Sequence, residues 1–219
     1  MFRSTSIKTR VGIVSLAVCL MATLAVADPT TGFRQDPFGF QLQWPFNLPQ
    51  SARFSFANGV YHLWVFSNDK PLRPGNTTRP RTEMRFPDYT SGAHQYAADL
   101  MVPSGTSGTC VFQIHTGDAQ SPKFGATQIM LFFEASNGGS LHIYHGQQIA
   151  SGLYNKYFHL NAIQDTNTHL ISIYINGALV FSKKDNNAGD FYMKSGVYGQ
   201  SDMSKEMQVF IRNPSLWSK

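Results

Sequence analysis

The chain is poor in charge and in cysteine. Only 14% of its 219 residues are Asp, Glu, Lys or Arg, and only two are Cys. Two cysteines exclude a scaffold of several disulfides and a zinc site built from several thiolates. The scarcity of charge, with 18 Gly and 11 Pro, excludes a coiled coil. The 17 Phe, 9 Tyr and 3 Trp provide apolar surface for a core and argue against intrinsic disorder, and the length suits one domain.

The first 27 residues have the pattern of a signal peptide. Three basic residues precede an apolar stretch over 11–26, and Ala25-Val26-Ala27 supplies small residues for cleavage before Asp28. A membrane anchor is the alternative, but the apolar run is short for a span and no second one follows. We therefore expect a secreted protein, free of the membrane after cleavage. Removal of the segment lowers the formal charge from +5 to +2, so basicity gives no argument for a nucleic-acid partner.

The remaining thiol and the histidines suggest no metal and no cofactor. Cys19 leaves with the signal segment, so Cys110 has no partner for an intramolecular disulfide, and we predict a buried, inert thiol. His142 and His145 have opposite strand parity, and the other histidines are scattered, which disfavours a metal site. The sequence Asn76-Thr77-Thr78 is a glycosylation acceptor pattern in a loop rich in Pro and Gly, consistent with secretion.

Short strands and turns fill the mature chain. Asn58-Gly59 and Asn176-Gly177 each join two runs rich in β-branched and aromatic residues, which predicts two tight hairpins. No long segment keeps a helical period. Turns at intervals of roughly 8–12 residues predict an all-β fold, a jelly-roll sandwich of two antiparallel sheets with a concave cleft. We expect one domain over 28–219, in which 28–50 forms a strand and loops packed on the body.

Three strands place polar side chains on one face and apolar side chains on the other, because alternate residues of a strand share a face. Their polar residues are Arg81, Glu83 and Arg85, then Gln113 and His115, then Tyr192, Lys194, Tyr198 and Gln200. Gly196 interrupts the third set and leaves room for a close approach to the backbone. Taken singly, each set is an ordinary solvated or half-buried face. If all three line one concave sheet, they form a cleft suited to a ligand with several carboxylates.

These three segments resemble the alginate lyases of polysaccharide lyase family 7. That family has an R-[ST]-E-[LM]-R strand, a Q-[IV]-H strand and a YFKAGxYxQ strand, which stand here in the same order as RTEMR (81–85), QIH (113–115) and YMKSGVYGQ (192–200). Met193 and Ser195 replace the usual Phe and Ala. The resemblance implies a β-jelly roll and β-elimination on a polymer of uronic acids. By resemblance, Ile114 in QIH implies a guluronate-type or mixed substrate.

The chain is also similar to plant citrate-binding proteins. The segments that carry this second likeness are DPTTGF (28–33), LWVFSNDKP (63–71), RPRTEMR (79–85) and VPSGTSG (102–108). It implies the same fold without chemistry, with the cationic cleft holding a small polycarboxylate. In such binding proteins we expect the histidine of QIH to be altered. His115 is retained here, which favours an active lyase.

Elimination from a 4-linked uronate needs a neutralised carboxylate, a base for the C5 proton and an acid for the leaving O4 oxygen. Arg81 and Gln113 suit the first task, because a guanidinium and an amide can donate to a carboxylate. His115 suits the base. Tyr198 suits the acid, with a pKa that we expect nearby Arg and Lys charges to lower. For the opposite C5 configuration, the resemblance implies that Tyr198 serves as both base and acid.

The other polar residues of the three strands are expected to bind neighbouring sugars. They are Glu83, Arg85, Tyr192, Lys194 and Gln200, and Glu83 is also expected to orient Arg81 or Arg85. The sequence thus predicts a secreted, monomeric lyase for an alginate-like or glucuronan-like polysaccharide. A glycoside hydrolase is disfavoured, because the cleft supplies one carboxylate where a pair is usual. The alternatives left open are a citrate-type binding protein and a lectin-like wall protein that holds an anionic glycan.

Overall fold

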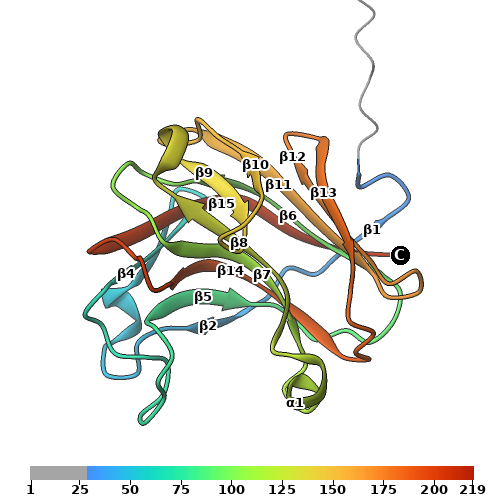
Figure 1. Cartoon of the computed structure of the whole chain (residues 1–219), viewed down its shortest axis with the longest axis horizontal. Coiled ribbons are helices and arrows are strands. Elements are labelled where there is room, and N and C mark those ends of the chain that lie inside the picture. The colour runs from blue at the N-terminus through green and yellow to red at the C-terminus, as the bar shows by residue number, and fades with distance from the viewer. Residues whose placement is uncertain (1–28) are drawn as a thin grey trace, which may run out of the picture.

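The computed structural model describes residues 29–219, which form two antiparallel sheets (Figure 1). Sheet A runs β13 (Ala178–Lys184), β12 (Leu170–Ile175), β11 (Tyr157–Asp165), β6 (Ala93–Met101), β15 (Glu206–Ser218), β4 (Val60–Phe66) and β3 (Phe54–Ala57), with β1 (Arg34–Asp36) also paired to β15. Sheet B runs β10 (Gln148–Ala150), β9 (Ser140–Ile143), β8 (Thr127–Glu134), β7 (Thr109–Thr116), β14 (Phe191–Gly199), β5 (Arg81–Arg85) and β2 (Gln41–Gln43). The predicted signal segment 1–27 lies outside the described residues.

Helical structure in this part of the chain is limited to single turns. They are η1 (Gln50–Ala52), α1 (Ser121–Phe124) and η2 (Ser136–Gly138). None of the helices within 29–219 is long and apolar enough to cross a bilayer. The prediction of an all-β jelly-roll sandwich is confirmed.

The core lies between the two sheets and is built by strand alternation. Met84 on β5, Ile114 on β7 and Met193 on β14 are all buried in one cluster with Leu63 and Val209 from sheet A. Each of these residues of sheet B alternates with polar side chains on the opposite face. Burial of the apolar set therefore fixes the strand faces, because a one-residue slip would reverse them.

Both predicted hairpins are present. Asn58 and Gly59 join β3 to β4 with φ values of 52° and 76°, and Asn176 and Gly177 join β12 to β13 with φ values of 50° and 80°. Two successive positive φ angles are those of a type I′ turn, whose twist matches the paired strands. The local sequence thus sets these two connections.

The N-terminal region differs from the expectation of a single strand. It contains two short strands in different sheets, since β1 pairs with β15 and β2 pairs with β5. The last strand continues past Arg212 to Ser218, although Asn213-Pro214 is a breaker pattern. A bulge between Arg212 and Ser215 absorbs these two residues, and β15 then resumes its pairing with β6.

The topology places three strands far apart in sequence next to one another. In sheet B, β14 lies between β7 and β5 and is antiparallel to both (Figure 1). These are the strands that carry the three motifs. Their polar faces therefore form one continuous surface.

Candidate active site

The strand register sets the spacing of the polar side chains. Lys194 lies between Gln113 and Arg85, its partners on the two neighbouring strands, and Tyr198 is paired with Arg81. Tyr192 is paired with His115. The predicted residues of β5, β7 and β14 therefore form rows across the sheet.

Glu83 is the centre of this surface. Gln113 Nε2 donates to Glu83 Oε1 over 2.6 Å, Arg81 NH1 donates to Glu83 Oε2 over 3.3 Å, and Lys194 Nζ lies 3.8 Å from that same oxygen. We name these four residues the Glu83 cluster. Glu83 contacts Arg81 and not Arg85, so the structure selects between the two partners considered from sequence.

The Glu83 cluster is buried, with 1% exposure at Glu83, 3% at Lys194 and 8% at Arg81. Within the described residues, Glu83 is the one carboxylate in ion-pair contact with either cation of the cluster. Two cations thus share one anion. Burial lowers the pKa of Lys194, the Glu83 charge opposes that shift, and the Arg81 charge adds to it. The cluster has one positive charge in excess, at the base of an open cleft.

Gly196 lets β14 approach β5 closely. It is paired with Glu83 and has a φ of 153°. A Cβ atom at this position would lie 2.2 Å from the carbonyl oxygen of Thr82 and 2.7 Å from the Cα atom of Glu83. The space left by the missing Cβ atom is therefore occupied by the backbone of β5, the strand that carries Glu83.

His115 is held in one tautomer. Its Nδ1 lies 2.6 Å from the carbonyl oxygen of Thr116, which can only accept, so Nδ1 carries the proton and Nε2 has the free lone pair when the ring is neutral. The ring stacks on Tyr192 at 4.7 Å between centroids. Burial lowers the pKa of His115, the Thr116 carbonyl partly offsets this, and Lys194 lowers it further. A neutral imidazole at pH 7 follows.

Tyr198 lies near the C-terminal end of β14. Tyr192, the strand partner of His115, lies near its N-terminal end. The guanidinium of Arg81 lies 3.7 Å from the centroid of the Tyr198 ring. The pKa of Tyr198 is raised and not lowered as predicted, although Arg81 acts in the predicted direction. Burial raises the pKa of Tyr198 and outweighs the opposing effect of Arg81, while Glu83 raises it further. The phenol thus keeps its proton at neutral pH, which is the form that an acid needs.

The remaining predicted residues lie around this centre. Arg85 covers the ring of Tyr192 at 4.0 Å and pairs with Asp88 over 2.6 Å. The Tyr192 hydroxyl donates to Asp118 over 3.1 Å, and burial, with the adjacent carboxylate, raises the Tyr192 pKa. Gln200 follows the end of β14, and its amide donates to the carbonyl oxygen of Tyr198. Gln200 thus supports the strand end beside Tyr198.

A cleft of about 820 Å³ lies over this face. Of the predicted site residues, Arg81, Arg85, His115, Tyr192 and Lys194 line it, whereas Glu83, Gln113, Tyr198 and Gln200 are not among its lining residues. Sequence reasoning missed part of its wall, namely Gln41, Gln43, Trp44, Leu72, Arg73, Asn76, Asp118 and Ser121. The alternation in QLQW (41–44) was an available signal, because it places both glutamines on one strand face. The loop residues 72–76 had no such signal, since their position depends on the packing of the whole loop.

Comparison with known proteins identifies the family of this chain. The model of the alginate lyase family, Alginate_lyase2, matches residues 39–215. The chain belongs to the alginate lyase family. Within this alginate lyase family, the alginate lyase AlgAT5 of polysaccharide lyase family 7 superposes with a TM-score of 0.63 at 20% identity, covering 81% of this chain and 94% of that one. An alginate lyase from Pseudomonas aeruginosa gives 0.64 at 17% identity, covering 82% and 98%. At these identities the superpositions establish the shared fold.

The chain is also similar to a protein that is named for citrate binding. The citrate-binding protein of Hevea brasiliensis is 37% identical over 183 residues, which cover 81% of this chain and 74% of that protein. Both likenesses stated from sequence are therefore confirmed.

Proposed function

We propose that this protein is a secreted polysaccharide lyase that cleaves a 4-linked uronate polymer, alginate-like or glucuronan-like, by β-elimination. The observation that carries the proposal is the Glu83 cluster, in which two buried cations share one carboxylate beneath an open cleft. A buried excess charge is costly unless a counter-ion compensates it. The carboxylate of a uronate ring supplies that counter-ion.

Arg81 and Gln113 are suited to receive the substrate carboxylate. Gln113 uses one amide hydrogen on Glu83 and has a second one available. The Nε atom of Arg81 is buried and has no hydrogen-bond partner among the described residues. These donors would stabilise the charge that develops on the carboxylate when the C5 proton leaves. Glu83 is a positioning residue in this scheme, since it is buried behind the groups that it orients.

His115 and Tyr198 divide the proton transfers. The free Nε2 of His115 takes the C5 proton, and the electrons of the C5–H bond form the C4–C5 double bond as the C4–O4 bond breaks. Tyr198 donates its proton to the departing O4 oxygen. For the opposite C5 configuration, Tyr198 would perform both transfers. This route requires the phenolate, and the raised pKa of Tyr198 disfavours that form. Tyr192 is the less suitable acid, because its hydroxyl already donates to Asp118.

Other cleft residues would hold the sugars on either side. Arg85 and Lys194 add positive charge, and the stacked rings of His115 and Tyr192 offer a flat surface to a sugar ring. We assign Gln200 to the support of Tyr198, whose carbonyl oxygen accepts a hydrogen bond from the Gln200 amide. The partner is an anionic polysaccharide met outside the cell by a monomeric protein, and the chemistry assigned to these residues uses no metal or cofactor.

A non-catalytic binding role is the second candidate. It is favoured by the 37% identity to a citrate-binding protein, and the excess positive charge of the Glu83 cluster suits a small polycarboxylate equally well. In that case the retained His115 would have no proton to transfer.

One experiment separates the two candidates. The mature chain is incubated with alginate, poly-glucuronate and pectate, and the ultraviolet absorbance of the unsaturated uronate product is followed over time. A lyase gives a rising signal that falls at least about a hundredfold in His115→Asn and Tyr198→Phe, the loss typical of a removed acid or base. Tyr192→Phe serves as the matched control and should keep most of the activity.

A protein that only binds gives no absorbance change with any of the three polymers. Citrate would then raise its melting temperature in a concentration-dependent way, and this rise would be lost in Arg81→Ala. Citrate stabilisation without product absorbance contradicts the lyase proposal.

A further inference from the structure

The wall of the cleft contains an amide whose oxygen has no partner. Gln43 lies on β2, the edge strand of sheet B next to β5, and lines the cleft. Its Oε1 atom is buried and accepts no hydrogen bond within residues 29–219. A buried acceptor without a donor is rare in folded proteins and destabilises them. Because Gln43 lies in the cleft wall, a ligand in the cleft can supply the donor.

The strand register directs Gln43 into the cleft. Its neighbour Leu42 is paired with Met84, a core residue, so strand alternation places Gln43 on the opposite face of the sheet. Gln43 itself is paired with Glu83. Side chains of directly paired residues lie on the same face and within reach of one another. The Gln43 amide therefore lies beside the Glu83 cluster, on the cleft face of sheet B.

The charges of the cleft restrict the missing donor to an uncharged group. Within the described part of the chain, the lining has four cationic side chains and one carboxylate, namely Arg73, Arg81, Arg85, Lys194 and Asp118. An ammonium or guanidinium group of a ligand would meet this excess of like charge. A carboxylate is ionised at neutral pH and has no proton to donate. In a uronate the donor that remains is a hydroxyl group, and citrate carries a hydroxyl as well.

We propose that Gln43 is a specificity-determining residue, which selects ligands that carry a free hydroxyl group close to the bound carboxylate. The inference rests on the proposed function, in which Arg81 and Gln113 receive that carboxylate. The hydroxyl donates to Oε1 of Gln43, while the carboxylate accepts from the Nε atom of Arg81, which is also buried and unpaired among the described residues. One ligand thus satisfies two buried groups on the adjacent strands β2 and β5.

Two pairs of probes isolate the hydroxyl group. A short 4-linked uronate oligomer is compared with the same oligomer O-acetylated at C2 and C3, and citrate is compared with tricarballylate, which is citrate without its hydroxyl. Calorimetry measures the affinities, and the oligomer titrations use a Tyr198→Phe background so that no turnover occurs. In each pair that binds, the member with free hydroxyl groups should bind about tenfold more tightly, the gain expected for one buried hydrogen bond.

Gln43→Met tests the role of the amide, because methionine keeps the length of the side chain and removes the oxygen. It should weaken the hydroxyl-bearing member about tenfold and leave the other member unchanged, so that the preference disappears. Gln43→Ala is the second variant if Gln43→Met does not fold. Gln41→Met is the matched control, since Gln41 lies on the same strand and lines the cleft but is exposed. It should change both affinities less than about twofold.

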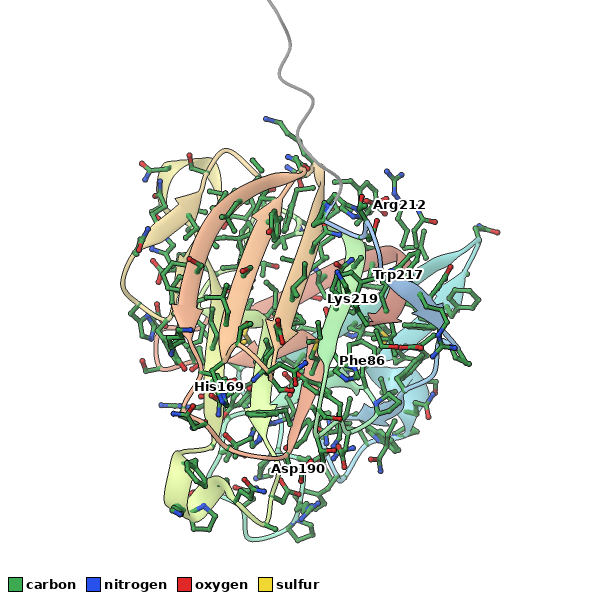
Figure 2. All side chains as sticks on the ribbon, turned by 90° about the vertical axis from the view of Figure 1, so that its right-hand side faces the viewer. Phe86, His169, Asp190, Arg212, Trp217 and Lys219 are labelled. Atoms are coloured by element: carbon green, nitrogen blue, oxygen red, sulfur yellow. The ribbon has the colours of Figure 1, made fainter. Side chains whose placement is uncertain are left out.

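Arg212→Met controls for attraction to surface charge. Figure 2 looks onto sheet A and labels Arg212, which lies on that sheet and is exposed, away from the cleft. This variant should leave all affinities unchanged.

The outcomes separate this inference from the proposed function. Equal binding of both members of a pair, a preference for the hydroxyl that persists in Gln43→Met and Gln43→Ala, or the same loss in either control overturns the inference alone. Absence of binding by every probe overturns the inference and the proposed function together.

Discussion

At the scale of single residues, the Glu83 carboxylate is the counter-ion that stabilises the buried cations Arg81 and Lys194. Glu83→Gln leaves the buried Arg81 and Lys194 without a counter-ion, so we expect the free energy of unfolding to fall by about 3–5 kcal/mol and activity to be lost. Denaturant unfolding followed by fluorescence measures the change. Asp88→Asn is the matched control, since the carboxylate of Asp88 is 51% exposed and its pair with Arg85 should contribute about 0–1 kcal/mol. Equal losses in both variants would contradict a buried electrostatic centre.

The protonation of His115 should set the acidic limit of activity. The base must be neutral, and its pKa is lowered from 6.5, so kcat/KM should stay high down to a pH below 6.5 and then fall as the ring is protonated. Lys194→Met removes a cation that lowers this pKa, so the acidic limb should move to higher pH. The pH–rate profile checks this, and NMR titration of the His115 ring checks it without turnover. A limb that does not move in Lys194→Met would exclude His115 as the titrating base.

At the scale of elements, the contact between β14 and β5 determines whether the motifs work together. Gly196→Ala places a Cβ atom 2.2 Å from the Thr82 carbonyl oxygen at a φ of 153°, so the strands must separate. We expect a loss of about 1–3 kcal/mol in unfolding free energy. Activity should fall as well, since Tyr198 moves away from Arg81. Thermal melting and the absorbance assay measure both effects.

The control for that substitution is Gly39→Ala. Its Cβ atom would meet nothing within 4 Å, so stability and activity should be unchanged. Full activity in Gly196→Ala would mean that the close approach of β14 to β5 is not needed for the site.

At the scale of the whole molecule, Cys110 reports global unfolding. It is fully buried on sheet B beside Met130 and Phe132, and burial raises the pKa of its thiol well above the usual value. Modification of the mature chain by a thiol reagent should therefore be slow and should accelerate with denaturant in parallel with unfolding. A cleft ligand should slow it by the same free energy by which it stabilises the fold. Rapid modification under native conditions would show that sheet B opens locally.

The sequence alone determined the fold class, the two Asn-Gly hairpins and the faces of the three motif strands. These features depend on local chemistry, namely positive φ at turn residues and alternation between core and surface. It also determined that one histidine, one tyrosine and a guanidinium lie on polar faces. Alternation along a strand cannot say which strands are neighbours, so the grouping of these residues was a hypothesis until the order β7, β14, β5 was known.

Only the tertiary structure decided how the polar groups act on one another. It placed Glu83 beneath Arg81 and Lys194, and it raised the pKa of Tyr198 although a cation lies beside the ring. It also buried Gln95 of β6 with neither amide atom paired among residues 29–219. The physical reason is that burial and pairing depend on strands that meet in space across long stretches of sequence. The balance between desolvation and charge at each group is therefore fixed only when the sheets pack.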